Sequence, residues 1–341
     1  MKKPIAALAA LAVSATLALT GCVAGEDAPA AVAPAGGDGW SSDHLNLDFA
    51  TYNPLSLIIK DKGWIEEALG DDVTVTWTQS AGSNKANEAL RAGAIDVGST
   101  AGSAALLARS NGSPIQVIDI YSQPDWAAIL VPAGSPITSV DDLRGAHIAA
   151  TKGTDPYFFL LQTLAEAGVG LDEVTIENLQ HADGKTALES GAVDAWSGLD
   201  PLLSTSVANG AAAIIYDNID FNSYGFLNAT ETFLKNSPDL AQVVVNAYEK
   251  ARAWALENPE DAAAILSDVA GISPEIASAV LNERSNLDID PVPGAAQRKV
   301  LEIIGPIFVD SGDVADQAAI DAALDSLFEP AYAQNAEPSA L

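Results

Sequence analysis

The chain of 341 residues carries 16 Lys and Arg against 46 Asp and Glu, which gives a formal net charge of −30 at pH 7. Nucleic-acid phosphates require a basic face that so acidic a chain lacks, and we therefore expect no nucleic-acid partner. The single cysteine excludes an internal disulfide.

Residues 1–21 have the features of an export signal. Lys2 and Lys3 precede an apolar run over residues 5–19, which is too short to span a membrane. The run ends in Leu-Thr-Gly-Cys, a sequence typical of bacterial lipoprotein signals. We predict that Cys22 is lipidated and anchors the exported protein to the cell membrane, facing the periplasm or the cell exterior. An ordinary secretory signal with an incidental cysteine is the alternative.

The composition predicts flexible segments at both ends of the folded part. Residues 22–43 are rich in Ala, Pro and Gly and show no apolar period, which is typical of a tether. The folded part is expected to run from about His44 to Pro330. Residues 331–341 are predicted to be a disordered tail.

Strands and helices alternate through most of the folded part. Short apolar or alternating runs predict strands at 45–50, 73–77, 94–97, 115–121, 127–131, 146–150, 174–179, 211–216 and 224–229. Helices are predicted between them at 55–69, 84–91, 101–109, 152–167 and 184–190. After residue 230 helices dominate, at 230–236, 238–258, 259–269, 273–283, 295–310 and 315–328. This order predicts an α/β fold with largely parallel sheets.

One stretch of the chain occurs twice. Residues 89–99 and 187–197 are identical at six of eleven positions. In each copy a helix ends at a glycine, which can adopt the left-handed conformation that closes it, and a short apolar strand with one Asp follows. We interpret the copies as two similar α/β lobes with a cleft between them, the usual place for a small ligand. Chance recurrence in an Ala-rich chain is the alternative.

Two helix starts are expected to face this cleft, at residues 100–103 and 153–155. The N-terminus of a helix offers free N–H groups and the positive end of its dipole, both of which suit an oxyanion. Glycine lets a ligand approach the backbone, and hydroxyl groups can donate hydrogen bonds. The candidate contacts are Thr100, Gly102, Ser103, Gly153 and Thr154. Plain helix caps are the alternative.

Several motifs occur in an order and spacing that resemble a known family. They are ALRAGAIDVG at 89–98, AILVP at 128–132 with SPI at 135–137 and DLRG at 142–145, TKGT at 151–154, GAVDAW at 191–196 followed by Asp200-Pro201, and Trp254 with ENPE at 257–260. Over residues 45–328 the chain resembles the periplasmic solute-binding proteins of ABC importers, in the group for nitrate, taurine and aliphatic sulfonates.

The resemblance implies a periplasmic-binding-protein-like fold, with two mixed sheets flanked by helices and two crossing strands as a hinge. Lobe 1 would comprise residues 44–130 and 226–330, and lobe 2 residues 131–225. The implied ligand is a small solute, an aliphatic sulfonate or taurine, delivered to an ABC permease and its ATPase. We expect a monomer without cofactor.

Further ligand contacts are expected from the resemblance. Tyr52 and Asn53 follow the first strand, where the family places a contact. Trp196 lies near the end of the second repeat and Asp200 lies just after it, although core packing explains Trp196 equally well. Gln123 and Trp126 lie just before a crossing strand and are secondary candidates.

Asp155 departs from the pattern of the sulfonate group, which has a small hydroxyl residue there. A carboxylate beside a bound sulfonate would repel it. If Asp155 only caps its own helix, the anion prediction stands. If it faces the cleft, a neutral or cationic ligand, such as a pyrimidine resembling a thiamine precursor, is favoured.

No motif for catalysis occurs. The three histidines, His44, His147 and His181, form no cluster, and there is no HExxH, Gly-x-Ser-x-Gly or Walker sequence, so we expect neither a metal site nor an enzyme. Some biosynthetic enzymes share the implied fold and remain an alternative. A surface adhesion or sensory module is a third class.

Overall fold

The structure, a computed structural model, describes residues 39–341. The predicted export signal, Cys22 and most of the predicted tether lie outside these residues. Among the described helices, none combines the length and apolar character needed to cross a bilayer.

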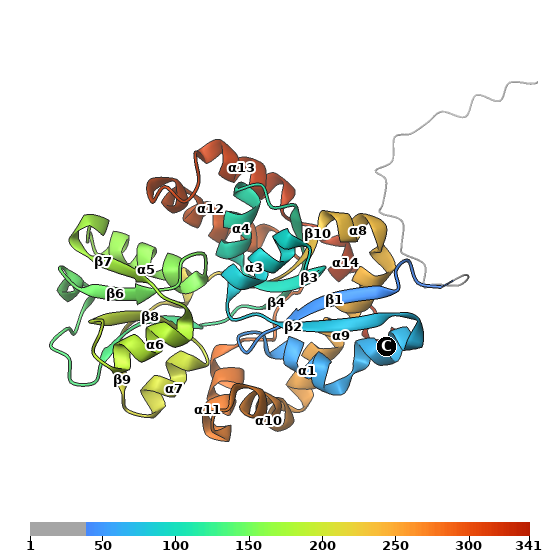
Figure 1. Ribbon diagram of the computed structural model, residues 1–341, viewed down its shortest axis with the longest axis horizontal. Helices are drawn as coiled ribbons and strands as arrows, with labels where there is room; N and C mark the ends of the chain where they lie inside the picture. Colours follow the sequence, from blue (N-terminus) through green and yellow to red (C-terminus); the bar gives the residue numbers. More distant parts are fainter. Residues whose placement is uncertain (1–38) are drawn as a thin grey trace, which may run out of the picture. The chain divides into compact units, whose positions relative to one another are not determined.

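The first sheet has five strands in the order β2-β1-β3-β10-β4 (Figure 1). They are β1 (His44–Phe49), β2 (Thr74–Gln79), β3 (Val97–Ala101), β4 (Ile115–Ser122) and β10 (Gly225–Thr230). β1 runs parallel to β2 and β3, whereas β10 runs antiparallel to β3 and β4. We call this sheet, with the helices that pack on it, lobe 1.

The second sheet also has five strands, in the order β7-β6-β8-β5-β9. They are β5 (Ala127–Pro132), β6 (His147–Ala150), β7 (Thr175–Asn178), β8 (Ala195–Leu199) and β9 (Ala212–Asp217). β6 runs parallel to β7 and β8, whereas β5 runs antiparallel to β8 and β9. This sheet and its helices form lobe 2. Two mixed sheets confirm the predicted fold class.

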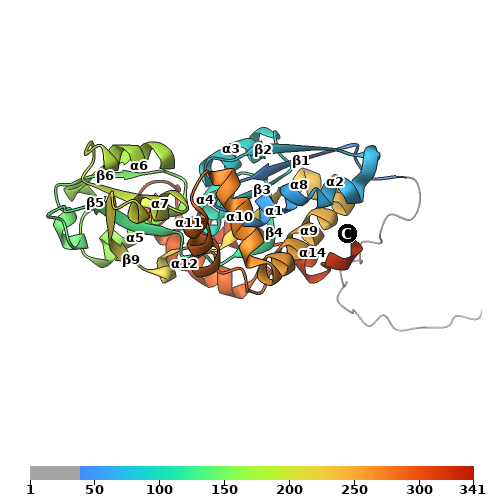
Figure 2. The same ribbon diagram turned by 90° about the horizontal axis from the view of Figure 1, so that it is seen from below.

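Helices cover both faces of each sheet. In lobe 1, α3 and α4 lie on one side and α1 and α9 on the other (Figures 1 and 2). In lobe 2, α5 lies opposite α6 and α7. The helices are α1 (Pro54–Lys62), α2 (Trp64–Leu69), α3 (Ser83–Ala92), α4 (Gly102–Ser110), α5 (Asp155–Glu166), α6 (His181–Glu189), α7 (Leu202–Ala208), α8 (Glu231–Asn236), α9 (Pro238–Glu257), α10 (Pro259–Ala270), α11 (Pro274–Ala279), α12 (Ala295–Asp310), α13 (Gln317–Ser326) and α14 (Ala331–Gln334). A π-helical turn, η5 (Val280–Arg284), follows α11.

Successive side chains of β5 point to opposite faces of the sheet and pack into two different apolar cores. Leu130 packs with Leu188 of α6 and with Trp196, in a small apolar cluster. Ile129 belongs to the main core, which includes Phe159 of α5. A strand buried on both faces needs a continuous apolar run, and residues 127–131 supply one.

The repeated stretch forms the same unit twice, α3–β3 in lobe 1 and α6–β8 in lobe 2. The glycines of the two copies have left-handed φ angles of 66° and 73°. Asp96 accepts a hydrogen bond from the backbone N–H of Asn46 at 2.8 Å, and Asp194 accepts one from His147 at 2.8 Å. The shared Asp thus ties the strand of each copy to its parallel neighbour, β3 to β1 and β8 to β6, which explains why both copies have it.

The chain passes between the sheets over residues 123–126 and 218–224. The resemblance placed the first boundary after residue 130, but all of β5 is hydrogen-bonded within the second sheet. The boundary therefore lies some residues earlier. Pro124 has no N–H to donate, and it separates β4 from β5.

The last residues differ from the prediction. Residues 331–341, expected to be disordered, contain α14 and a final 3₁₀ turn. Gln242 of α9 donates to the carbonyl of Tyr332 at 3.0 Å, and Lys250 donates to the carbonyl of Leu341 at 2.9 Å. Ala333 is buried. Partners about 90 residues away order this segment, so its own composition does not reveal the order.

Candidate functional site

Loops from both lobes meet where the parallel strands end. Ser103, in the first turn of α4, contacts Asp155, the first residue of α5. Asp200, which follows β8, contacts Arg284 of η5. In open α/β sheets, loops at the carboxyl ends of strands form the ligand crevice. The loops predicted to border the cleft are thus in direct contact.

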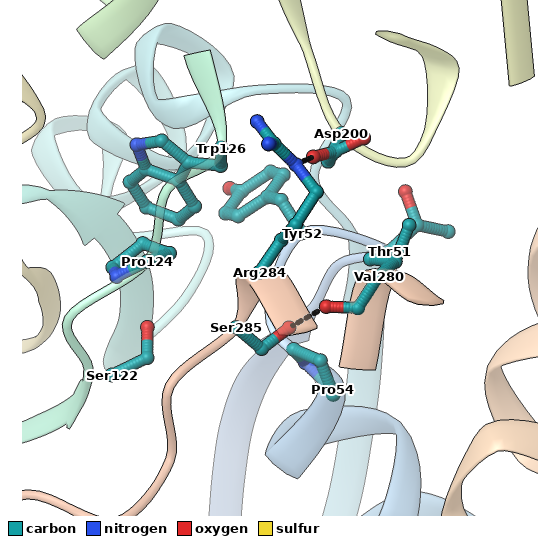
Figure 3. Close-up of a pocket in the computed structure, with 10 residues that line it drawn as sticks. All are labelled: Thr51, Tyr52, Pro54, Ser122, Pro124, Trp126, Asp200, Val280, Arg284 and Ser285. Atoms are coloured by element: carbon teal, nitrogen blue, oxygen red, sulfur yellow. Dashed lines mark hydrogen bonds and ion pairs between the residues drawn. The ribbon is translucent and has the colours of Figure 1, made fainter. Parts of the chain in front are cut away.

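A pocket lies among these loops (Figure 3). It has about 290 Å³ of unfilled space, its mouth included. Lobe 1, lobe 2 and the first passage between them all contribute to it. Its lining residues are Thr51, Tyr52, Pro54, Ser122, Pro124, Trp126, Asp200, Val280, Arg284 and Ser285.

Two aromatic rings form one wall of the pocket. The rings of Tyr52 and Trp126 meet edge to face, with centroids 6.1 Å apart and planes at 84°. The Tyr52 hydroxyl donates to the carbonyl of Ser99 at 3.0 Å, and the Trp126 indole donates to Asp155 at 2.8 Å. Both rings are therefore fixed and offer an apolar surface suited to the organic part of a ligand.

Arg284 supplies the positive charge of the pocket. Its Nε bonds Asp200 at 2.6 Å, and its Nη1 lies 3.0 Å from Asp125 and 3.4 Å from Asp217. Its Nη2 is buried and makes no hydrogen bond within the structure. Burial raises the pKa of Asp125 to about 6, although the Arg284 charge opposes this rise. The Nη2 N–H groups thus lack an acceptor within the structure, although three carboxylates surround the cation.

The Asp155 side chain faces the cleft between the lobes and does not cap its own helix, which is the second of the two orientations considered from the sequence. Its carboxylate makes no hydrogen bond to its own helix. It accepts hydrogen bonds from Ser103, Ser223 and Trp126 and is only 1% exposed. Burial raises the pKa of Asp155, and these hydrogen bonds offset the rise only in part. The carboxylate therefore faces lobe 1.

Of the predicted contacts, Tyr52 and Asp200 line the pocket, and Ser103 and Asp155 join it through Trp126. The others make contacts within the protein. Asn53 caps α1, Thr100 accepts from Asn228, Gly102 packs against Phe226, the N–H of Gln123 donates to Asn286, Gly153 lies beside Asn84, Thr154 donates to Thr151, and Trp196 is fully buried in lobe 2.

The sequence did not reveal Arg284, the one cation that lines the described pocket. No motif surrounds it, and it meets Asp200 only because the chain folds 84 residues back on itself. Trp126 precedes β5, and its position in the sequence does not reveal its contact with Asp155. Both contacts depend on tertiary structure.

His181 lies at a second contact between the lobes. Thr151 donates its hydroxyl proton to the carbonyl of Leu179 at 2.7 Å, so its oxygen accepts from Nδ1 of His181, 3.1 Å away. This network assigns the ring proton to Nδ1. Nε2 is buried without a partner, next to Gly82 of lobe 1. Burial lowers the pKa of His181 to about 4, so the ring is neutral.

Within residues 39–341, no group of three or more His, Cys, Asp or Glu is placed so that it could hold a metal ion. The three carboxylates around Arg284 pair with its guanidinium instead.

Comparisons with known proteins identify the family. A family model described as NMT1/THI5 like matches residues 56–262. A protein of Bacillus subtilis (strain 168), named an aliphatic sulfonates-binding protein, is 30% identical over 268 residues, which cover 75% of this chain and 80% of the relative. The chain belongs to the NMT1/THI5-like family of solute-binding proteins. A protein of the same name from Escherichia coli (strain K12) is 29% identical and covers 64% of this chain and 69% of its own length.

Solved structures of this family share the fold. The alkanesulfonate-binding protein from Xanthomonas axonopodis pv. citri, bound to MOPS, aligns with a TM-score of 0.75 at 22% identity, over 83% of this chain and 98% of its own. The aliphatic sulphonate-binding protein from Escherichia coli aligns with a TM-score of 0.71 at 24% identity, over 83% and 97% of the two chains. The Bacillus subtilis and Escherichia coli relatives are named binding proteins and not enzymes, in agreement with the prediction that the chain is not an enzyme.

We predict that the protein becomes less stable in acid because of His181. The unfolded imidazole takes up a proton near pH 6.5, whereas the buried ring does so only near pH 4. The free energy of unfolding should fall by about 1.4 kcal/mol per pH unit between these values. Urea unfolding at pH 6.5 and 5.0 should show a loss about 2 kcal/mol larger in the native chain than in His181→Gln. Equal losses would contradict the buried neutral ring.

Proposed function

We propose that this protein captures an organosulfonate, such as taurine or an alkanesulfonate, and delivers it to the permease and ATPase of an ABC importer. The observation that carries the proposal is the unpartnered Nη2 of Arg284 at a pocket with two fixed aromatic rings. A guanidinium hydrogen-bonds an oxyanion strongly, and aromatic rings pack on an alkyl chain. Both named relatives are aliphatic sulfonates-binding proteins, which supports this ligand class.

A neutral or cationic ligand is the second candidate. Asp125, Asp200 and Asp217 surround Arg284, and Asp155 faces the other lobe. If all four are ionised, the negative charges near the pocket outnumber the one cation. A cation or a neutral heterocycle would then experience less repulsion than a sulfonate.

We expect substitution of Arg284 to separate these candidates. In the mature chain, taurine and short alkanesulfonates should raise the melting temperature, because a ligand that binds only the folded state stabilises it. Arg284→Gln should weaken their affinity by at least about tenfold, since it removes a charged hydrogen bond. Titration calorimetry gives the affinity, and the melting temperature without ligand reports folding.

Arg298→Gln is the matched control. Arg298 pairs with Glu302 and Asp325 on the surface and does not line the pocket. Its loss should leave ligand affinity unchanged. Binding of amines or neutral heterocycles, with no response to sulfonates in the native chain, would support the second candidate.

We also propose that acyl chains at Cys22 hold the protein, as a monomer, at the outer side of the cell membrane. Two or more acyl chains give a stable anchor. Cys22→Ser should move the protein from the membrane fraction to the soluble fraction on cell fractionation. An unchanged distribution of the variant would contradict the anchor.

A further inference from the structure

Four hydrogen-bond donors converge on the Asp155 carboxylate. Oδ1 accepts from the hydroxyls of Ser103 and Ser223, each at 2.6 Å. Oδ2 accepts from the backbone N–H of Ser223 and from the Trp126 indole, each at 2.8 Å. No cation of the described chain pairs with this carboxylate. Neutral donors alone therefore compensate a buried charge.

Asp155 and its donors together belong to both lobes and to both segments that connect them. Ser103 belongs to α4 of lobe 1, whereas Asp155 begins α5 of lobe 2. Trp126 lies in the first passage between the sheets, and Ser223 lies in the second. The backbone N–H of Ser103 also donates to the Ser223 hydroxyl at 2.9 Å. One carboxylate thus links both lobes to both connecting segments.

The same donors would suit an external oxyanion. Two hydroxyls, an indole N–H and a backbone N–H, beside the N-terminus of α4, are groups that hold sulfate-like anions. The carboxylate of Asp155 already accepts from all of them, and no charged partner remains to stabilise a second anion. A ligand oxyanion at this position would have to displace Asp155 and leave its charge buried without donors, which is costly.

We propose that Asp155 is a specificity-determining residue that acts as an internal anion: it fills the oxyanion position between the lobes and confines the charged group of the ligand to the Arg284 side of the pocket. The inference rests on the pocket of the proposed function, but not on its sulfonate ligand. Removing the carboxylate should open a new oxyanion site. A neutral side chain of the same shape should keep the position filled.

The test compares Asp155→Ala with Asp155→Asn and the native chain, with sulfate and methanesulfonate as probes. Asp155→Ala should bind both probes at least tenfold more tightly than the native chain, as measured by titration calorimetry. Asp155→Asn should gain nothing, because its amide can donate to the two serine hydroxyls while its oxygen accepts from Trp126 and Ser223. No gain in a folded Asp155→Ala chain would overturn the proposal. A gain in Asp155→Asn equal to that in Asp155→Ala would do the same.

Two further variants locate the effect. Adding Ser103→Ala and Ser223→Ala to Asp155→Ala should abolish the gain, whereas a gain that persists would mean a site elsewhere and overturn the proposal. Adding Arg284→Gln to Asp155→Ala should leave the gain intact. Taurine binding to the native chain is thus tested separately, and either proposal can fail without the other. If Asp155→Ala does not fold, Asp155→Ser is subject to the same expectations.

Discussion

A charge removed from water needs either an opposite charge or several hydrogen-bond donors, and this requirement shapes the contact between the two lobes. Arg284 meets it with three carboxylates from lobe 2 and the first passage. Asp155 meets it with four neutral donors. If the lobes separated and no water entered, Arg284 and Asp155 would each lose the groups that compensate their charge. The pocket lies beside these two groups, so a solute held there would lie next to the side chains that join the lobes.

An apolar contact accompanies the polar ones. Phe158 of α5 packs on Phe308 of α12, with ring centroids 4.2 Å apart. α12 belongs to the helices that follow β10, so the C-terminal part of the chain touches lobe 2 directly. Apolar contact is non-directional and tolerates small rotations, whereas the hydrogen bonds of Asp155 demand a defined geometry. The relative position of the lobes is therefore specified more narrowly by the polar groups than by the apolar contact.

The sequence predicted the lobes well because their signals are local. A glycine after a helix, then a short apolar strand with one Asp, predicted the repeated unit, and Asp96 and Asp194 make equivalent bonds in the two copies. The site was harder to predict, because its charged contacts join residues far apart in the chain. Trp196 lies near the end of the second repeat and Asp200 just after it, yet Trp196 packs in the core and Asp200 lines the pocket, a difference that only the tertiary structure reveals. The orientation of Asp155 likewise depends on Ser223, 68 residues away.

The most direct test is a crystal structure of the mature chain grown with taurine or a short alkanesulfonate. We predict sulfonate oxygens within about 2.7–3.2 Å of Arg284 Nη2 and an organic part that contacts Tyr52 and Trp126. The four hydrogen bonds of Asp155 should remain in place. A sulfonate among Ser103, Ser223 and Trp126, with the Asp155 carboxylate displaced, would contradict this assignment of the charged groups.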